Sequence, residues 1–451
     1  MMRRGYQMLR YLTVSNYKSI GDAVELSMVA TRERRHGDRL ARVGRSRVLP
    51  VAALYGANAA GKSTLVDALA VLQRLVTEGR SKGELLPVVP HRLVGRQQPT
   101  TVGVEIVVPA SVGGTGAARD WVFYYEVTAD RREVHQESLA RLRSADEEVL
   151  FERVGTEVTF YGELADDETA QAAARLLIGN QTVLGLLGSV EGGPATVVAV
   201  RSWFSDCLRV IYPGADHVFL PERLAVDEVF ADAMNRGLSE ADTGISRIDF
   251  EDVPASRFLS QEQVAESLER LTAEGGHLVL AEPSGDRAVL SLRDDGELRF
   301  QRMVAVHDGA PGADSGPTEG FSLPLNEESD GTARFMNLLP ILFQLDEERS
   351  RSVFVVDELE NSMHPLLTQE LIRTFLDGLG PDGRRQLIFT THELQLMRAP
   401  LLRRDEIWLV DKKRNETGLT RLSDFSGEGV RADADLLGIY TSGRLGGVPR
   451  I

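Results

Sequence analysis

The chain has 451 residues and a formal net charge of −16, from 51 Lys and Arg against 67 Asp and Glu. Its composition, 42% hydrophobic and 26% charged, is that of a globular protein and excludes the disordered and fibrous classes. The acidic balance excludes a protein coated with basic surface for wrapping nucleic acid, so any DNA contact must be a local patch.

Cysteine usage and apolar runs bear on the compartment. The single cysteine, Cys207, permits neither an internal disulfide nor a thiolate zinc cluster, which fits a reducing compartment. The basic start of the chain is interrupted by Ser15, Asn16 and Lys18 before an apolar run forms, which does not fit a signal peptide. No apolar stretch reaches the about 20 residues of a membrane span. We therefore expect a cytoplasmic protein that does not use a membrane.

Residues 1–165 predict a strand-rich lobe. Residues 9–30 alternate apolar and polar positions as two short strands. Residues 31–48 carry seven arginines against two acidic residues, the one local excess of positive charge. The apolar strand 49–56 then leads into a helical pattern at 63–76. Further strands are expected at 101–109, 121–128 and 149–161.

The sequence pattern becomes helical over residues 166–275, where apolar residues recur at spacings of three and four. We expect a helical insertion there, including a helix at 202–211. Residues 276–425 predict a second lobe in which strands and helices alternate, as in a parallel α/β sheet. The stretch 308–320 reads as a Gly- and Pro-rich loop. Residues 426–451 form a C-terminal tail.

A complete phosphate-binding motif lies between the strand 49–56 and the helix 63–76. It has the form G-x-x-x-x-G-K-[ST], and its residues are Gly56, Ala57, Asn58, Ala59, Ala60, Gly61, Lys62 and Ser63, followed by Thr64. Glycines let the backbone curl round phosphates, and amides at a helix N-terminus face their negative charge. We expect Lys62 to reach the β- and γ-phosphates of ATP, and the Ser63 hydroxyl to bind Mg²⁺.

Two carboxylates end the apolar strand 353–358, in the arrangement of a Walker B motif. Asp357 would lie beside Ser63 and hold the metal, and Glu358 would act as general base on the attacking water. An apolar strand ending in Asp-Glu is common by itself and can be a plain strand terminus. Paired with the earlier P-loop, it predicts nucleotide hydrolysis.

His392 ends the apolar strand 386–392, one strand–helix–strand unit beyond Asp357. A histidine at that position can touch the γ-phosphate. Taken singly, a histidine at a strand end is more often a surface or satisfied core residue. Its place next to the Walker B strand favours the catalytic interpretation.

Ser329 and Gly331 lie in the sequence Glu-Ser-Asp-Gly-Thr just before a helical pattern. Such a helix N-terminus can bind an anion. A simple N-cap by Ser329 explains the same residues equally well. Both interpretations stay open at this point.

The order and spacing of these motifs resemble the ABC-type ATPase head shared by SMC, RecF and OLD-family proteins. The segments YGANAAGKST, EESDGTARF, DELENSMHP and IFTTHELQLM, with the tail IYTSGRLGGVP, resemble more closely the RloA-type AAA ATPases of prokaryotic antiphage defence, including the PARIS ATPase. The resemblance spans both ends of the chain and is weakest in the insertion. It implies an α/β fold, a two-lobed ABC-type head with mixed and parallel sheets and a helical insertion.

The resemblance also implies a homodimer or higher homo-oligomer in which two heads sandwich two ATP molecules. Ser329 and Gly331 would then face the γ-phosphate of the partner's nucleotide, and Lys62, Glu358 and His392 would act in catalysis. The sequence departs from a transporter signature, and it shows no unambiguous Q-loop glutamine. Gln136 and Glu137 are the candidates, although both suit surface residues.

Three further features of the sequence bear on function. The arginines of 31–48 could bind DNA phosphates, a protein partner or the neighbouring ATP, or simply form a solvated loop. Lys18 could lie near the nucleotide or face solvent. Asp433 and Asp435 do not make a nuclease pair, because too few residues follow His392 for a fused Toprim domain.

The resemblance therefore predicts an ATPase that regulates a separately encoded effector, a Toprim or RloB-like nuclease, in antiphage defence. The alternative is a RecF-like ATP-dependent DNA-binding repair protein, which the acidic total charge weakens. A nucleotide-binding subunit of a membrane transporter is disfavoured by the signature. A sensor that binds ATP without hydrolysis is disfavoured by Glu358.

Overall fold

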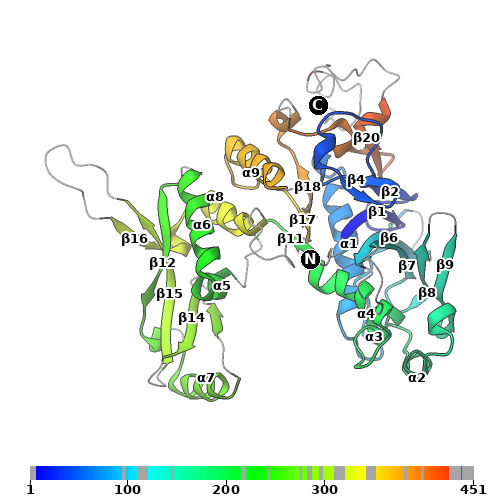
Figure 1. Cartoon of the computed structure of the whole chain (residues 1–451), viewed down its shortest axis with the longest axis horizontal. Coiled ribbons are helices and arrows are strands. Elements are labelled where there is room, and N and C mark those ends of the chain that lie inside the picture. The colour runs from blue at the N-terminus through cyan, green and yellow to red at the C-terminus, as the bar shows by residue number, and fades with distance from the viewer. Residues whose placement is uncertain are drawn as a thin grey trace. The chain divides into compact units, whose positions relative to one another are not determined.

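A computed structural model shows two compact units, whose elements are labelled in Figure 1. Unit 1 comprises Met1–Pro213, Asp346–Leu359 and Leu379–Ile451, and unit 2 comprises Gly214–Leu345 and Glu360–Gly378. The structure describes residues 7–93, 98–109, 120–143, 146–214, 220–241, 243–257, 259–274, 277–281, 287–293, 298–308, 320–341, 352–379, 384–397, 401–425 and 438.

An antiparallel sheet forms the N-terminal part of unit 1. Its strands lie in the order β10 (Glu157–Phe160), β9 (Glu147–Val154), β8 (Val134–Leu142), β7 (Asp120–Ala129), β6 (Thr100–Pro109), β1 (Met8–Ser15) and β2 (Val24–Ser27). A short hairpin of β3 (Ala41–Val43) and β4 (Ser46–Val48) follows β2 in the chain. Alternate residues of β7 are buried, as expected for a sheet with one face on a core.

A second, mostly parallel sheet forms the rest of the unit 1 core. Its order is β11 (Leu208–Ile211), β17 (Val353–Val356), β18 (Gln386–Thr391), β5 (Val51–Tyr55), β19 (Ile407–Lys413) and β20 (Glu416–Arg421), with only β20 antiparallel to its neighbour. Every residue of β5, β17 and β18 is buried, which is typical of central parallel strands. Because parallel strands end at the same edge, the residues that follow these three strands meet there.

A buried glutamine ties the two sheets of unit 1 together. Gln386, with no exposed surface, starts β18. Its Oε1 accepts from the Leu9 backbone N at 2.7 Å, and its Nε2 donates to the carbonyls of Leu9 and Leu49, each at 3.0 Å. One hydrophobic core extends over residues of both sheets. The helices of this unit are α1 (Lys62–Thr77), α2 (Glu168–Leu176), α3 (Val183–Leu187) and α4 (Ala195–Ser202).

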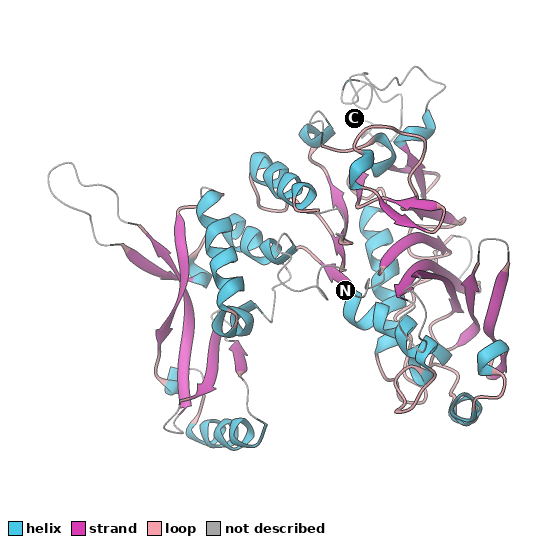
Figure 2. Ribbon diagram, viewed as in Figure 1, coloured by secondary structure: helices cyan, strands magenta, loops and turns pink. Residues whose placement is uncertain are grey.

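Unit 2 combines an antiparallel sheet with helices, as the cyan and magenta ribbons of Figure 2 show. Its sheet order is β12 (Ile245–Asp252), β15 (Leu298–His307), β14 (Arg287–Leu292) and β13 (Leu278–Ala281), and β16 (Phe321–Pro324) pairs with the end of β15. Its helices are α5 (Leu220–Val226), α6 (Glu228–Glu240), α7 (Gln261–Glu274), α8 (Asp330–Leu338) and α9 (Pro365–Asp377). A small core joins α7 to the sheet through Leu271, Leu290 and Phe300.

The predicted fold class is confirmed: the protein is α/β, with a parallel sheet that carries the P-loop and a mixed set of further sheets. The helix expected at 202–211 is wrong in its second half. There α4 gives way to a π-helical turn, Trp203–Cys207, and then to β11. A short apolar run suits a helix or a strand equally, and pairing with β17 makes this one a strand.

The division of the chain was expected at different points. The two compact units cut across the range 166–275, because unit 1 extends to Pro213. That range is also not all helical, since it contains β11 and β12. The four ranges 1–165, 166–275, 276–425 and 426–451 stay a prediction about domains, because compact units need not coincide with domains. The tail 426–451, except residue 438, and the loop residues 309–319 lie outside the described residues.

Candidate functional site

The P-loop connects β5 to α1 through a backbone that only glycine allows at two points. Gly61 has φ of 113°, and a Cβ there would lie 2.1 Å from Thr417 Oγ1. A Cβ on Gly56 would lie 2.3 Å from the carbonyl oxygen of Val410 in β19. The loop between them exposes Asn58 and Ala59. The predicted strand, loop and helix order is therefore what the structure has.

Lys62 is buried at the first turn of α1 and points back over its own loop. Its Nζ donates to the carbonyl oxygens of Gly56 and Ala57 at 2.8 and 3.2 Å. The same Nζ lies 3.0 Å from His392 Nε2. The structure thus joins two residues predicted from distant motifs.

The Walker B carboxylate contacts the P-loop hydroxyl. Ser63 Oγ donates to Asp357 Oδ1 at 3.1 Å. Asp357 is buried at the end of β17, whereas Ser63 is exposed. A hydroxyl and a carboxylate are oxygen ligands that suit Mg²⁺, which keeps its other positions for water and phosphate oxygens. Among the described residues, no group of three His, Cys, Asp or Glu could hold a metal ion.

Thr390, in the strand between β5 and β17, orders the two carboxylate residues. Its hydroxyl donates to Asp357 Oδ1 and accepts from the backbone N of Glu358, each at 2.7 Å. Glu358 adopts a left-handed backbone with φ of 48°, a strained conformation that occurs often at functional sites. The sequence pointed to His392 in the segment Thr390-Thr391-His392 but gave Thr390 no role. A hydroxyl at the end of the strand next to Walker B was the available signal.

A second set of hydroxyls supports the loop from behind. Thr417, in β20, donates to the carbonyl oxygen of Ala60 at 2.8 Å and contacts Ser19 Oγ at 2.8 Å. Ser19 Oγ in turn lies 2.9 Å from Thr64 Oγ1. Thr64, predicted as a nucleotide-binding residue, therefore turns its side chain to Ser19. Nothing in the local sequence marks Thr417, because its partners lie hundreds of residues away in the chain.

Lys18 lies at the other flank of α1. Its ammonium pairs with Asp67, one turn after Ser63, and the Tyr212 hydroxyl donates to the other oxygen of Asp67 at 2.8 Å. Burial is the main cause that raises the pKa of the Tyr212 hydroxyl, and the Asp67 carboxylate adds to it. Lys18 is exposed and is held beside α1 by this ion pair, and its contact with a nucleotide stays a prediction.

The signature residues belong to unit 2. Ser329 is the N-cap of α8, and its Oγ accepts from the backbone N of Thr332 at 3.1 Å. A Cβ on Gly331 would lie 2.5 Å from the carbonyl oxygen of Ser362, so glycine is required there. The preceding Glu328 is held by His307 Nε2 at 2.6 Å. The N-cap interpretation is therefore confirmed, and a contact with a partner's nucleotide stays a prediction.

The two Q-loop candidates have different environments. Gln136 is exposed on β8. Glu137 is fully buried and accepts from the backbone N of Val183 and of Leu184 at 2.7 and 2.9 Å, at the N-terminus of α3. Burial raises the pKa of Glu137, while the charge of Arg153 lowers it. Glu137 is a buried cap of α3 and therefore not a surface residue, and a Q-loop role for either residue stays a prediction.

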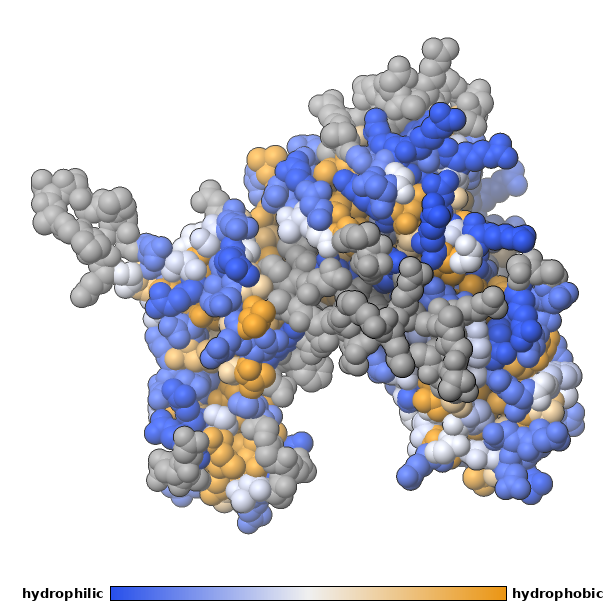
Figure 3. All heavy atoms as spheres, viewed as in Figure 1, coloured by the Kyte–Doolittle hydropathy of each residue, from blue (hydrophilic) through white to orange (hydrophobic). Residues whose placement is uncertain are grey.

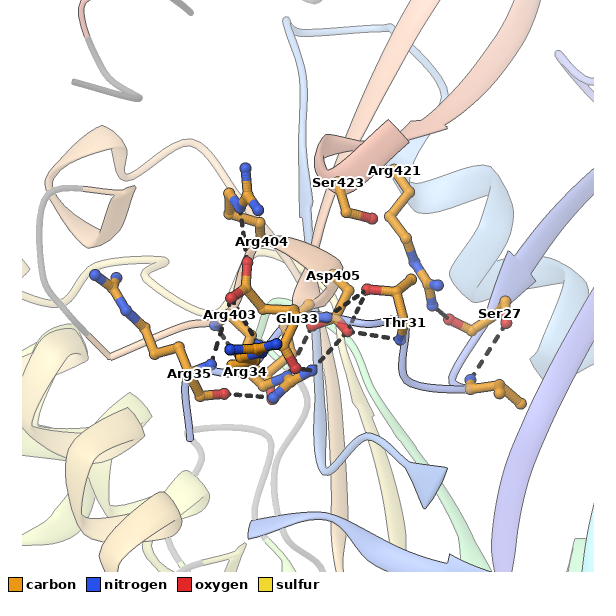
Figure 4. Close-up of polar contacts among 12 residues, drawn as sticks. Ser27, Thr31, Glu33, Arg34, Arg35, Arg403, Arg404, Asp405, Arg421 and Ser423 are labelled. Atoms are coloured by element: carbon orange, nitrogen blue, oxygen red, sulfur yellow. Dashed lines mark hydrogen bonds and ion pairs between the residues drawn. The ribbon is translucent and has the colours of Figure 1, made fainter. Parts of the chain in front are cut away.

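The arginine-rich segment 31–48 divides into two parts. The first part, which precedes the β3–β4 hairpin, is held by Arg403, whose guanidinium donates to the carbonyl oxygens of Glu33 and Arg35 (Figure 4). Asp405 accepts from the backbone N and hydroxyl of Thr31 at 2.8 and 2.9 Å. The second part is the β3–β4 hairpin. The rejected nuclease pair, Asp433 and Asp435, lies outside the described residues.

The sheet order, with Lys62, Ser63, Asp357, Glu358 and His392 at one edge of the sheet, defines a P-loop nucleotide-binding protein. Comparison with family models sharpens this class. Residues 51–196 and 214–398 match the AAA_21 model, described as "AAA domain, putative AbiEii toxin, Type IV TA system". The chain belongs to this family of AAA domains.

Solved structures give more distant likenesses. The chain is similar to an SMC head bound to the C-terminal winged-helix domain of ScpA (TM-score 0.42, 14% identity, covering 92% of this chain and 99% of that one). It is also similar to the SMC head domain from Thermotoga maritima (0.36, 13%, 92% and 98%). A third is the recombination mediator RecF-ATPrS of the RecFOR pathway (0.33, 12%, 93% and 100%). No curated protein matches the chain.

In the described part of the chain, every helix is too short or too polar to cross a membrane.

Proposed function

We propose that the chain binds MgATP and hydrolyses it in an ABC-type site shared between two copies, and that this cycle controls a separately encoded effector. The main support for this proposal is one edge of the parallel sheet, where five residues lie together: Lys62, Ser63, Asp357, Glu358 and His392. These residues come from three separate parts of the chain. Their chemistry is that of phosphoryl transfer to water.

Each residue has a distinct role in the proposed reaction. Lys62 would leave its loop carbonyls and hold the β- and γ-phosphates of ATP. Ser63 and Asp357 would hold Mg²⁺, which neutralises phosphate charge when bound. Glu358 would accept the proton of the attacking water, so that ADP and phosphate are the products. His392, whose Nε2 lies 3.0 Å from Lys62 Nζ, would contact the γ-phosphate.

The signature residues would supply the second half of each ATP site. Ser329 and Gly331 present the N-terminus of α8, whose positive dipole end favours an anion. They lie in unit 2, whereas the nucleotide residues lie in unit 1. From the resemblance to ABC-type heads we infer that they serve the nucleotide of a second copy, and that a single copy hydrolyses ATP slowly.

The test of the chemistry compares two matched variants. Glu358→Gln should lower ATP turnover about 10²- to 10⁴-fold while ATP binding is retained, because only the proton acceptor is lost. Glu393→Gln makes the same change one residue after His392 and should leave turnover near that of the wild type. Retained turnover in Glu358→Gln would remove Glu358 as the base.

The proposed effector is a nuclease, Toprim or RloB-like, and the proposed setting is antiphage defence in the cytoplasm. The family description names a toxin–antitoxin system, which supports a role exercised together with a second protein. Cells that carry this chain and its neighbouring gene should restrict phage plating, and cells with Lys62→Ala should not. If the chain alone arrests growth, it is itself the toxin and the effector proposal fails.

The RecF-like alternative shares the ATP chemistry and differs in its cellular task. It predicts that loss of the chain sensitises cells to DNA damage while phage plating stays unchanged. Survival after irradiation therefore separates the two functions.

A further inference from the structure

Two arginines lie directly opposite each other on the β3–β4 hairpin. Arg42 and Arg47 are cross-strand partners, and both side chains are exposed, as is Arg45 in the turn. Like charges directly opposite on a sheet destabilise it. The opposite face of the hairpin is buried through Ala41, Val43 and Val48. Folding explains that buried face, but it does not explain the charged one.

Acidic side chains do not offset these charges. Within the described ranges, Arg42, Arg45 and Arg47 form no ion pair. The carboxylate of Glu105 is used by Arg10, at 2.5 Å. Arg10 itself donates to Ser46 of the hairpin at 3.2 Å. The hairpin therefore gathers positive charge without neutralising it.

The hairpin is firmly attached to the rest of unit 1. The backbone N of Ala30 donates to the carbonyl oxygen of Arg47 at 2.8 Å, and Leu49 N donates to the carbonyl oxygen of Met28 at 2.7 Å. Val48 is fully buried. The three guanidinium groups are thus presented on a fixed backbone, which lowers the entropy cost of binding.

The positive charge of residues 31–48 contrasts with the negative net charge of the chain. Residues 31–48 contain seven arginines and no lysine in a chain of net charge −16. Figure 3 shows strongly hydrophilic side chains over the part of unit 1 where Figure 1 places β4. Arginine differs from lysine because its planar group binds phosphate oxygens in a bidentate way. The residue choice therefore indicates a phosphate-bearing ligand.

The absence of aromatic residues narrows the ligand further. Residues 31–48 contain no Phe, Tyr or Trp, whereas single-stranded nucleic acid is usually held by stacking on such rings. A membrane-surface segment would also carry apolar or aromatic side chains on its exposed face. A rigid set of arginines without rings suits the backbone of a duplex.

We propose that the face of Arg42, Arg45 and Arg47 on the β3–β4 hairpin binds the phosphate backbone of duplex nucleic acid without sequence preference. This binding does not depend on ATP hydrolysis. The acidic remainder of the surface confines the duplex to this hairpin.

The first experiment measures binding of the full chain to a fluorescent 30-base-pair duplex over a series of salt concentrations. Replacing Arg42, Arg45 and Arg47 by Gln together should weaken binding at least about tenfold and reduce the salt slope by about 2 to 3. The matched control replaces Arg131, Arg132 and Arg175 by Gln, which are also exposed arginines of unit 1. The control should bind as the wild type does, although its net charge changes equally.

The second experiment separates binding from folding. Arg47→Glu converts the like-charge pair into an attractive pair with Arg42, so Tm should rise by about 1–3 °C while duplex binding weakens. A fall in Tm, or binding equal to that of the wild type, overturns the proposal.

Competing ligands serve as further outcomes. Single-stranded DNA of the same length and vesicles of phosphatidylserine and phosphatidylcholine should bind more weakly than the duplex. Preference for either one overturns the proposal. Absence of duplex binding with normal ATP turnover overturns this inference alone, and duplex binding without ATP turnover overturns only the proposed function.

Discussion

A single hydroxyl holds the two carboxylate residues of the candidate site in place. Thr390 is fully buried, so water cannot replace its bonds to Asp357 and to the backbone N of Glu358. Thr390→Val keeps the shape and leaves that N–H unpaired. We expect the free energy of unfolding to fall by about 1–3 kcal/mol, and ATP turnover to fall more than ATP affinity. Urea titrations and steady-state kinetics measure both.

Thr390→Ser is the control for this prediction, because it keeps the hydroxyl and removes only a methyl group. It should retain most of the turnover. If the Ser and Val variants behave alike, the hydroxyl does not order the site.

Single residues can be predicted from the sequence where they belong to a short motif. Lys62, Ser63 and Asp357 were foreseen, and the structure brings them together with His392. Thr417 and Ser19 were not, because their hydroxyls act through contacts between segments that are far apart in the chain. A hydroxyl carries no pattern of its own until the fold supplies its partner.

The P-loop is packed against β19 so closely that its first glycine has no room for a side chain. A Cβ on Gly56 would meet the carbonyl oxygen of Val410 at 2.3 Å, and a backbone cannot yield as a flexible side chain can. Gly56→Ala should therefore lower the free energy of unfolding by about 1–3 kcal/mol. Gly79→Ala, where no atom lies within 4 Å of the new Cβ, should change it by less than about 0.5 kcal/mol. Equal denaturation midpoints would contradict the close packing.

The turn Arg404–Glu406, which directly follows Arg403, contains a carboxyl group whose protonation affects stability. Burial is the main cause that raises the pKa of Glu406 to about 8 from 4.5, and the Asp405 carboxylate adds to it. The folded state therefore keeps a proton that the unfolded state loses above pH 4.5. The contribution of this group is full below that pH and is lost as the pH rises through about 8.

Glu406→Gln should remove this pH dependence. Relative to the wild type, the variant should gain stability as the pH rises from about 5 to about 8. Chemical denaturation at several pH values measures the difference, and a difference that does not change with pH would contradict the raised pKa.

Helices were predicted best where the apolar pattern continued over many residues. The helices α2, α6 and α7 follow repeats of three and four, and they were foreseen. The strand β11 was missed because its four residues, three of them apolar, are too few to distinguish a strand from a helix. The strand β8 was also missed, and Glu137 within it caps α3 across the fold, a role that no local pattern shows.

For the whole molecule, the two units carry different parts of the proposed site. Unit 1 holds the P-loop and both carboxylates, and unit 2 holds Ser329 and Gly331. If the signature serves the nucleotide of a second copy, then Lys62→Ala and Ser329→Arg each inactivate a homodimer by damaging opposite halves of every site.

Mixing these two inactive variants should restore activity. In a mixed dimer one site has both damaged halves, and the other has both intact halves. Random exchange makes half of the dimers mixed, so about a quarter of the wild-type ATP turnover should return. Turnover is measured against the mixing ratio and should be greatest at equal amounts. If each site lay within one chain, no ratio would restore turnover, and the shared site would be wrong.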